Sequence, residues 1–358
     1  MIRIRQGLVL DILEEDEEFQ EILVQVENNK NKAINYLHLN GRVIKGEVIK
    51  LNTTAVNLNL GTGGYHFVLP NKLLEKKLSG PGHIMKMRYT PQQIKVLAVE
   101  EEASPFHEQI QGFTHLNNIP VVIGFLHSMI TPALAGIRAV NENLKVSYIM
   151  TDGGALPLAF SKTIRILKEK KWLIGTLTSG HAFGGDLETV NIYSALAAAF
   201  IVQKPDLILI AMGPGNVGTG TQLGTTALEV GQIINAVASL GGNPIVIPRV
   251  SFGDSRNRHQ GLSHHVITVL NKIALVPATV ILPIIKNNNR DILNKQIKEH
   301  QLASKHKIIF ESGFEGVAYL KSCGFNVTTM NRSLEEDEEF FLTACAGGTF
   351  AAKLVQFK

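Results

Sequence analysis

The pattern of apolar and polar positions changes about a third of the way along the chain. Up to about residue 100, short and partly alternating apolar runs are separated by turns such as Asn40-Gly41 and Gly61-Thr-Gly-Gly64. Alternation with a period of two, interrupted by turn residues, is typical of short antiparallel strands. We therefore predict a small antiparallel β-barrel or sandwich domain over residues 1–103, with residues 55–60 (AVNLNL) as one of its strands.

From Ile119 onward, unbroken apolar runs such as IPVVIGF, VSYIM and DLILIAM alternate with helical patterns. Strands buried on both faces of a parallel sheet lack polar alternation. We predict an α/β domain over residues 119–358 with a doubly wound parallel sheet, Rossmann-like or flavodoxin-like. A linker helix over residues 104–118 precedes it. Residues 187–202 are predicted as one long helix, and residues 326–330 (NVTTM) as the last strand.

Composition and charge narrow the function classes. Of the 358 residues 45% are hydrophobic, so the chain can fill a sizeable core, and the net charge of +4 is spread along it. Nucleic-acid binding favours a concentrated basic stripe. The two cysteines form no CxxC pair, the N-terminal region turns acidic, and the most apolar stretch, residues 195–202, is too short to span a bilayer. We expect a cytoplasmic protein without a membrane partner.

Polar residues gather where the predicted parallel strands end. In an open parallel sheet, ligands bind outside the carboxyl ends of the strands. Turn chemistry explains any one polar loop, but it explains five successive ones less well. We therefore predict one ligand site that extends from His127 to His265. The segments rich in Gly, Ser, Thr, His and Asp are residues 126–128, 151–154, 179–186, 213–221 and 251–265.

The loop after the fourth of these strands is predicted to hold an anion. It precedes a predicted helix over residues 221–240, and helix N-termini attract anions. It matches G-x-G-x-x-G, but Pro214 removes a donor, the loop does not follow the first strand, and no Gly-Lys-Ser/Thr follows. A turn that caps the helix is the alternative. The anion-binding candidates in this loop are Gly213, Gly215, Asn216, Gly218, Thr219 and Thr221.

The segment from Asp254 to His265 is the densest in charged and imidazole groups. Arginine forks suit phosphate or carboxylate groups, so Arg256 is assigned to anion binding together with Asp254 and His259. Ser179, at the end of the third strand, joins this set. A lone histidine is more often a helix cap or a satisfied polar contact, which is the interpretation for His265.

Five residues are candidates for acid–base catalysis: His181, Asp186, Asp152, His264 and His127. Histidine titrates near neutral pH, and a carboxylate can orient it. All of them except His127 are also candidates for binding a divalent metal, but no H-x-x-x-H or H-E-x-x-H motif links them, so no metal ligand is assigned. A serine nucleophile is a further alternative, although the G-x-S-x-G motif is absent.

The N-terminal domain offers fewer candidates. Small barrels can bind oligonucleotides through interleaved aromatic and basic residues. The residues of these types are sparse, so packing or assembly, including homo-oligomerisation, is the favoured role. They are Tyr65, His66, Phe67, Lys86, Arg88 and Tyr89.

Several of these segments together resemble a bacterial family of about this length, known as a domain of unknown function. The segments are His127-Ser128, 152–157 (DGGALP), 179–188 (SGHAFGGDLE), 213–215 and 254–256, of which GHAFGGDLE is the most specific. The resemblance covers nearly the whole chain and implies a bacterial, intracellular protein. It implies no activity.

Two main hypotheses follow. The first is a hydrolase or group transferase acting on a small anionic, phosphorylated or nucleotide-like ligand, with His181 or His264 as acid/base and Asp152 or Asp186 as the orienting carboxylate. The second is a non-catalytic small-molecule sensor whose β-domain transmits occupancy to a partner. Nucleic-acid binding through the barrel is a weaker third. If His181, Asp186 and His264 point into separate packed environments, the catalytic hypothesis in this form fails.

Overall fold

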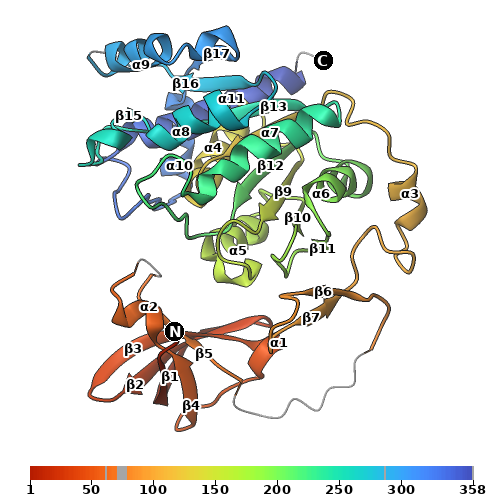
Figure 1. Cartoon of the computed structure of the whole chain (residues 1–358), viewed down its shortest axis with the longest axis vertical. Helices are drawn as coiled ribbons and strands as arrows, with labels where there is room; N and C mark the ends of the chain where they lie inside the picture. Colours follow the sequence, from red (N-terminus) through yellow and green to blue (C-terminus); the bar gives the residue numbers. More distant parts are fainter. Residues whose placement is uncertain (61–62, 71–78, 286–287, 357–358) are drawn as a thin grey trace. The chain divides into compact units, whose positions relative to one another are not determined.

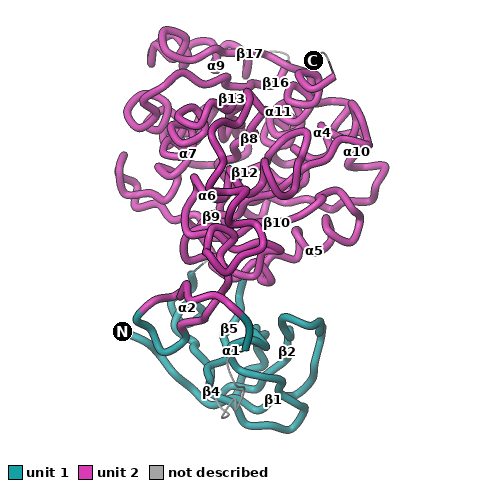
Figure 2. Tube along the Cα trace, turned by 90° about the vertical axis from the view of Figure 1, so that its right-hand side faces the viewer, with its two compact units in different colours: residues 1–80, 89–92 teal, residues 81–88, 93–358 magenta. Residues whose placement is uncertain are grey.

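The change of pattern along the chain corresponds to two units. The computed structural model describes residues 1–60, 63–70, 79–285 and 288–356. Contacts divide the chain into unit 1, residues 1–80 and 89–92, and unit 2, residues 81–88 and 93–358 (Figure 2). The antiparallel hairpin of β6 (Ile84–Lys86) and β7 (Ile94–Val96) is grouped with unit 2. The predicted boundaries at residues 103 and 118 stay predictions, and segment 104–118 contains a short helix, α3 (His107–Gln111).

The unbroken apolar runs form one eight-stranded sheet in unit 2, with every neighbouring pair parallel (Figure 1). Its order is β11-β10-β9-β12-β8-β13-β16-β17. The predicted parallel α/β class is confirmed, although this order differs from the Rossmann and flavodoxin orders. The strands are β8 (Pro120–Gly124), β9 (Val146–Thr151), β10 (Gly175–Thr178), β11 (Leu187–Glu188), β12 (Leu207–Met212), β13 (Asn243–Ile247), β16 (Thr279–Pro283) and β17 (Lys307–Glu311).

Helices cover both faces of the sheet. Right-handed crossovers place helices on opposite faces when successive connections run in opposite directions along the sheet. On one face α4, α10 and α11 pack together, and on the other α7 contacts α6 and the turn after α8. The helices are α4 (Ile130–Val140), α5 (Lys162–Glu169), α6 (Ile192–Ala198), α7 (Glu229–Ser239), α8 (His264–Thr268), α9 (Asn288–Glu299), α10 (Phe314–Ser322) and α11 (Glu338–Gln356).

The contact between α4 and α11 depends on two glycines. A Cβ on Gly136 would overlap the carbonyl of Cys345, and one on Gly348 would overlap the carbonyl of Ala133. The two helices therefore approach to backbone contact, and α11 is buried along most of its length. This packing closes one face of the sheet and holds the segment before α11 close to the strand ends.

The strand order places a change of direction at the middle of the sheet. After β8 the chain turns to α4 on one face, whereas after the neighbouring β13 it turns to α8 on the other. Loops that diverge in this way leave space between them at the carboxyl ends of the strands, where ligands of open α/β sheets bind. The centre of the sheet is thus the place to look for a site.

Unit 1 is the predicted small β-domain. Its five strands form a mixed sheet whose order, β1-β2-β3-β5-β4, returns to β1. The pairs are antiparallel as predicted, except that β3 and β5 are parallel. Its elements are β1 (Ile4–Glu15), β2 (Phe19–Val26), β3 (Asn29–Tyr36), α1 (Leu37–Asn40), β4 (Val48–Asn52), α2 (Thr54–Asn57) and β5 (Tyr65–Val68).

Three predicted elements are wrong. Residues 55–60 are not a strand, because α2 occupies their first half. The long helix over residues 187–202 starts only at Ile192, after the short strand β11. Residues 326–330 form no strand, and β17 is the last strand of the sheet. Within the described residues, none of the helices has the length and apolar character needed to cross a membrane.

Candidate functional site

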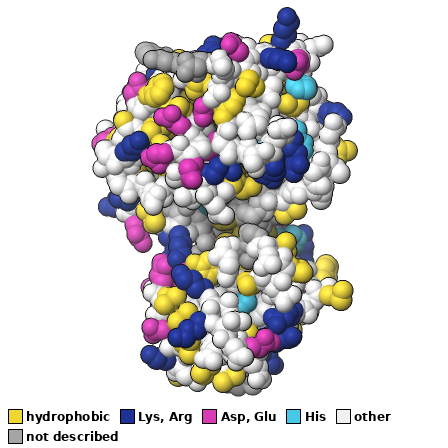
Figure 3. All heavy atoms as spheres, turned by 90° about the vertical axis from the view of Figure 1, so that its left-hand side faces the viewer, with side chains coloured by type: hydrophobic (Ala, Val, Ile, Leu, Met, Phe, Trp, Pro, Cys, Tyr) yellow, Lys and Arg dark blue, Asp and Glu magenta, His cyan; other side chains and the backbone are white. Residues whose placement is uncertain are grey.

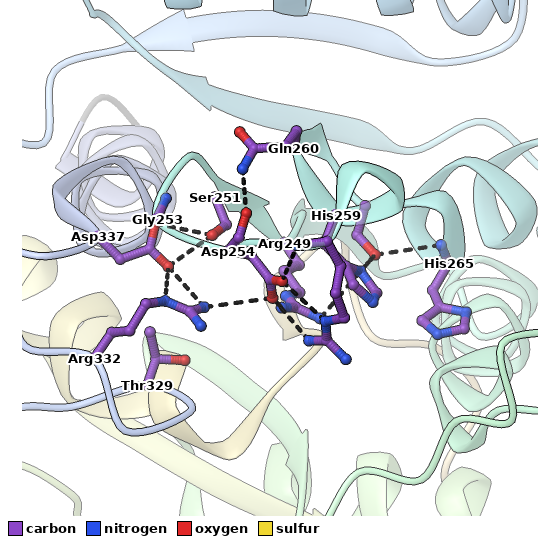
Figure 4. Close-up of polar contacts among 12 residues, drawn as sticks. Arg249, Ser251, Gly253, Asp254, His259, Gln260, His265, Thr329, Arg332 and Asp337 are labelled. Atoms are coloured by element: carbon purple, nitrogen blue, oxygen red, sulfur yellow. Dashed lines mark hydrogen bonds and ion pairs between the residues drawn. The ribbon is translucent and has the colours of Figure 1, made fainter.

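An arginine and carboxylate cluster lies just beyond β13. The buried Asp254 accepts hydrogen bonds from Nη2 of Arg249 at 2.6 Å and from Nε and Nη2 of Arg256 at 2.9 and 2.8 Å. Its Oδ2 also lies 3.7 Å from Arg332. The hydrogen bond from Arg256 is the largest cause that holds the pKa of Asp254 below its usual range, and the charge of Arg249 acts in the same direction. Figure 4 shows Asp254 between Arg249 and Arg332.

The segment before α11 completes this cluster from about eighty residues away in sequence. The hydroxyl of Ser251 donates to the carboxylate of Asp337, whose two oxygens lie 2.9 and 2.7 Å from it, and Asp337 pairs with Arg332 at 3.0 Å (Figure 4). Ser128, at the end of β8, contacts Thr329 at 3.0 Å, and Thr329 exchanges backbone hydrogen bonds with Arg332. The ends of β8 and β13 therefore meet the same segment.

Positive charge is in surplus in this cluster. Three guanidinium groups, those of Arg249, Arg256 and Arg332, face two carboxylates, those of Asp254 and Asp337. The side chain of Arg256 is 43% exposed, so its outer edge remains available to solvent or to a ligand. Figure 3 shows Lys and Arg side chains gathered near His side chains on one face of unit 2.

Three imidazole rings lie next to the arginines. The centroids of His264 and His265 are 3.8 Å apart, and His259 lies 5.1 and 5.6 Å from them. His259 is held by a 2.8 Å hydrogen bond between its Nδ1 and the hydroxyl of Ser263, which also caps α8. The structure thus brings His265, interpreted from sequence as a helix cap, into the group.

These rings are neutral near pH 7. Burial, with the charges of Arg249 and Arg256 acting in the same direction, lowers the pKa of His259 to about 3. Burial lowers the pKa of His265 to about 4 and also lowers that of His264. Nε2 of His264 and Nδ1 of His265 are buried without a hydrogen-bond partner among the described residues.

A second group lies at the ends of β9 and β12. Glu229, in the first turn of α7, accepts a hydrogen bond from the hydroxyl of Thr151 at 2.8 Å. Burial raises the pKa of Glu229 to about 7, and the nearby charge of Asp152 adds to the rise, against the bond from Thr151. Our sequence predictions missed Glu229, because it falls inside a predicted helix; only its place in the first turn at a strand end could have singled it out.

His127 belongs to this central region. Its Nδ1 lies 3.1 Å from the carbonyl of Met212 and its Nε2 lies 2.6 Å from the hydroxyl of Ser161. A carbonyl only accepts, so Nδ1 donates to Met212 and Nε2 is left to accept from Ser161. Burial lowers the pKa of His127 to about 4. Ser161 also caps α5 by accepting from Ile164 N–H, so the pair has a structural role as well.

The GHAFGGDLE segment is occupied by contacts within the fold. Glu188 pairs with Nζ of Lys86 at 2.6 Å and accepts from the hydroxyl of Thr178 and the N–H of Gly184. Lys86 is only 1% exposed and also donates to the carbonyls of Thr178 and Ala182. Lys86 therefore ties β6 to this segment and is not available as a nucleic-acid contact.

Of the predicted catalytic residues, His181 and Asp152 are in contact, but only through the backbone N–H of His181, while Asp186 and His264 have other partners or neighbours. Nδ1 of His181 accepts a hydrogen bond from Met87 N–H, and the ring lies near Arg88. The backbone N–H of His181 donates to the carboxylate of Asp152. Asp186 accepts from Lys168 and from the N–H and hydroxyl of Thr176, at the start of β10. His264 lies in the imidazole group. The predicted candidates for a divalent metal include His181, Asp186 and His264, so they are separated in the same way.

The predicted anion loop, Gly213 to Thr221, does not lead directly into a helix. α7 begins only at Glu229, after a 3₁₀ turn over Thr226–Leu228. The loop makes bonds with itself, including Thr226 to Asn216 at 2.6 Å and Thr219 to Thr221 at 3.0 Å. A side chain at Gly218 would begin 3.2 Å from Nε2 of His265, so the loop borders the imidazole group.

The remaining loop positions are placed as follows. Gly213 is buried against the backbone of Ala155, and Gly215 is exposed. Ser179 is buried at the end of β10, where its N–H donates to the carbonyl of Met150. The helix N-terminus that motivated the anion assignment is absent at Gly213–Thr221.

Comparison with known proteins adds one match. The family model described as "Protein of unknown function (DUF3866)" matches residues 32–348. No curated protein and no solved structure matches the chain. Because the match spans both units and all the strand-end groups described above, the chain belongs to the family of proteins of unknown function DUF3866.

Proposed function

We propose that the protein is an enzyme, a hydrolase or group transferase, that acts on a small anionic ligand at the carboxyl ends of β8, β9, β12 and β13. The ligand class is one with a phosphate or carboxylate group. Arg256 and Arg332 would hold this group, and Glu229 with Asp152 would supply acid–base chemistry. This assignment replaces His181 and Asp186, which other parts of the fold engage.

The observation that carries the proposal is the surplus of guanidinium groups around Asp254. A buried arginine needs a carboxylate partner, and one carboxylate suffices for one arginine. Asp254 instead pairs with both Arg249 and Arg256, while Arg332 pairs with Asp337 and also lies 3.7 Å from Asp254, so three arginines share two carboxylates. Guanidinium groups beyond those needed for pairing are suited to bind phosphate or carboxylate, often through two parallel hydrogen bonds.

The carboxyl pair supports catalysis at the same edge of the sheet. Two neighbouring carboxyl groups whose environments differ are a common acid–base arrangement. Glu229 is partly buried and Asp152 is exposed. The loop after β12 borders both the carboxyl pair and the imidazole group. Gly218 faces His265, while Thr226 contacts the sulfur of Met212, which lies close to Gly153.

A second candidate function is a non-catalytic binding protein for the same ligand class. The separate environments of His181, Asp186 and His264 favour it, because the trio that defined the first catalytic hypothesis is not assembled. Both candidates share the anion site and differ only in turnover.

Ligand binding is tested first by thermal shift with inorganic phosphate, sulfate, citrate, sugar phosphates and nucleotides. A ligand at a hundred times its Kd stabilises the folded state by about 2.7 kcal/mol. We expect Arg256→Gln to weaken binding of the best ligand about tenfold or more, since a charged hydrogen bond contributes about 1.5–3 kcal/mol. Arg5→Gln is the matched control, because its side chain is also 43% exposed and also pairs with a carboxylate.

Absence of stabilisation by any of these anions, or an equal loss in both arginine variants, would overturn the anion site. Turnover is then followed by mass spectrometry of the bound ligand. If the wild-type protein transforms it and Glu229→Gln binds it without transforming it, the protein is an enzyme of the proposed kind. An unchanged ligand after prolonged incubation with the wild-type protein assigns the binding function instead.

A further inference from the structure

We propose that His259, His264 and His265 form a binding site for a divalent metal ion of the zinc class. Their ligand nitrogens all lie within 4.8 Å of one another. This set differs from the one considered from sequence, since only His264 is common to both. The inference goes beyond the proposed function, because metal binding can be measured without any substrate.

Local structure explains why three imidazoles meet. His259 ends a short 3₁₀ turn (Asn257–His259), and the two-stranded pairing of β14 (Val250–Ser251) with β15 (Gly261–Leu262) returns the chain to the start of α8. His264 and His265 are the first two residues of that helix. The hairpin and the helix start therefore project three rings into one space.

Unused hydrogen-bonding capacity indicates a missing ligand. A buried polar atom without a partner is costly, and native proteins rarely leave one. Here two neighbouring atoms lack a partner among the described residues, Nε2 of His264 and Nδ1 of His265, and the latter side chain is only 7% exposed. A metal ion would satisfy both nitrogens at once.

The third ring is oriented by a neighbouring hydroxyl. Ser263 contacts Nδ1 of His259 at 2.8 Å. Nη1 of Arg249 lies 3.3 Å from the same Nδ1 and can only donate, so metal binding requires this guanidinium to turn away to its partner Asp254. Nδ1 then donates to the hydroxyl of Ser263, and Nε2 carries the lone pair that a metal requires. Hydrogen bonds to the second nitrogen of a ligating histidine commonly fix its orientation in this way. Ser263 is therefore a positioning residue.

The donor set determines the class of metal. Three imidazoles and an open fourth position are typical of catalytic zinc, with Zn–N bonds of about 2.0–2.1 Å. Magnesium and calcium prefer oxygen ligands, which this group lacks. Two nitrogens on one tetrahedral ion are about 3.3 Å apart. The ligand nitrogens lie within 4.8 Å of one another, so side-chain rotations that bring them closer by up to about 1.5 Å close the site.

The positive charge of the neighbouring arginines determines which fourth ligand the metal ion would prefer. Arg249, Arg256 and Arg258 place positive charge near the three rings, which opposes a bare dication. An anionic fourth ligand, such as hydroxide or phosphate, removes this conflict. We therefore expect inorganic phosphate to strengthen metal binding.

The test is titration of the full-length, chelator-treated protein with Co²⁺, followed by visible absorption, and with Zn²⁺, followed by calorimetry. We expect one ion per chain, the intense d–d bands of a four- or five-coordinate Co²⁺, displacement by Zn²⁺, and none by a large excess of Mg²⁺. His264→Ala and His265→Ala should each weaken Co²⁺ binding at least tenfold. His306→Ala is the control, because His306 is also a buried histidine, like His265, and both of its nitrogens are hydrogen bonded.

His264→Cys distinguishes ligation from folding. A thiolate at this position should keep the metal and add a sulfur-to-cobalt charge-transfer band in the near ultraviolet. Lack of Co²⁺ binding by the wild-type protein overturns the proposal, as does unchanged binding in both alanine variants. Bound Co²⁺ without the charge-transfer band in His264→Cys removes His264 from the site and also overturns it. These results are independent of whether any anion binds or reacts.

Discussion

Two polar loops of unit 2 are alike in sequence but differ in how far other parts of the fold already engage their polar side chains. In the GHAFGGDLE segment, Glu188 and Asp186 each accept several hydrogen bonds from nearby strands and lysines. Beyond β13, the loop from Arg249 to His265 keeps unpartnered imidazole nitrogens and a surplus of guanidinium groups. The most distinctive stretch of sequence is the one whose polar groups are fully used by the fold.

The difference teaches how a structural loop can be distinguished from a binding loop. Both are rich in Gly, His and Asp, so composition does not separate them. The criterion is whether each buried donor and acceptor already has a partner. Amino-acid substitutions test this comparison, and the one with the largest expected effect on stability is at Lys86.

Lys86→Met should destabilise the protein most. It removes the partner of Glu188 and the donor to two carbonyls, and losing one member of a buried pair costs about 3–5 kcal/mol. Urea unfolding measures the loss. Adding Glu188→Gln should recover part of it, because the two residues interact directly. A loss below about 1 kcal/mol would show that the segment is not held as described.

Glu229→Gln should change stability in the opposite direction, and only at high pH. Because the pKa of Glu229 is raised from 4.5 to about 7 in the folded state, unfolding releases a proton within this window. The wild-type protein therefore loses stability as the pH rises from 4.5 to about 7. At about pH 8 the variant should be more stable by about 1–3 kcal/mol.

At about pH 4 the two proteins should unfold alike, because both side chains are then neutral. The measurement is the free energy of unfolding in urea at both pH values. Equal stability at about pH 8 would mean that Glu229 is as well solvated as an ordinary surface carboxylate and that burial does not raise its pKa as described.

Asp186→Asn should have the smallest effect. Asp186 and Lys168 are 43% and 40% exposed, and exposed pairs contribute at most about 1 kcal/mol. The hydrogen bonds to Thr176 add a loss of similar size. Stabilisation by phosphate in a thermal-shift assay should not change. Loss of that stabilisation in a stably folded Asp186→Asn protein would return Asp186 to the binding site.

Much of the fold could be predicted because buried strands appear in the sequence as runs of apolar residues. The strands of the sheet are unbroken apolar runs, which identified every strand except the two-residue β11. Residues 55–60 misled because a short amphipathic turn and a short strand share the same apolar spacing. The prediction for residues 326–330 was wrong because Val and Thr favour strands, whereas here Thr329 contacts Ser128 and exchanges backbone hydrogen bonds with Arg332.

The site was harder to predict because its contacts join distant segments. The loop from Arg249 to His265 was recognised, since its charged residues are adjacent in sequence. The contact of Asp337 with Ser251 crosses 86 residues and depends on the close packing of α4 and α11. No local pattern shows whether a given His or Asp already has a partner. The sequence therefore did not show that other parts of the fold engage His181 and Asp186, His265 was interpreted as a helix cap or satisfied contact, and Glu229 was missed.

The position of β8 in the sheet has a consequence for how the protein is made. β8 is the first strand of the sheet in the chain, yet its neighbours are β12 and β13, which end at Met212 and Ile247. A ribosome adds roughly 5–20 residues per second, so roughly 6–25 seconds pass before both neighbours have been synthesised. During that time an apolar strand has two unpaired edges, which are prone to aggregation. The order of synthesis thus leaves the centre of the sheet open to pairing with other chains before its own neighbours have been made.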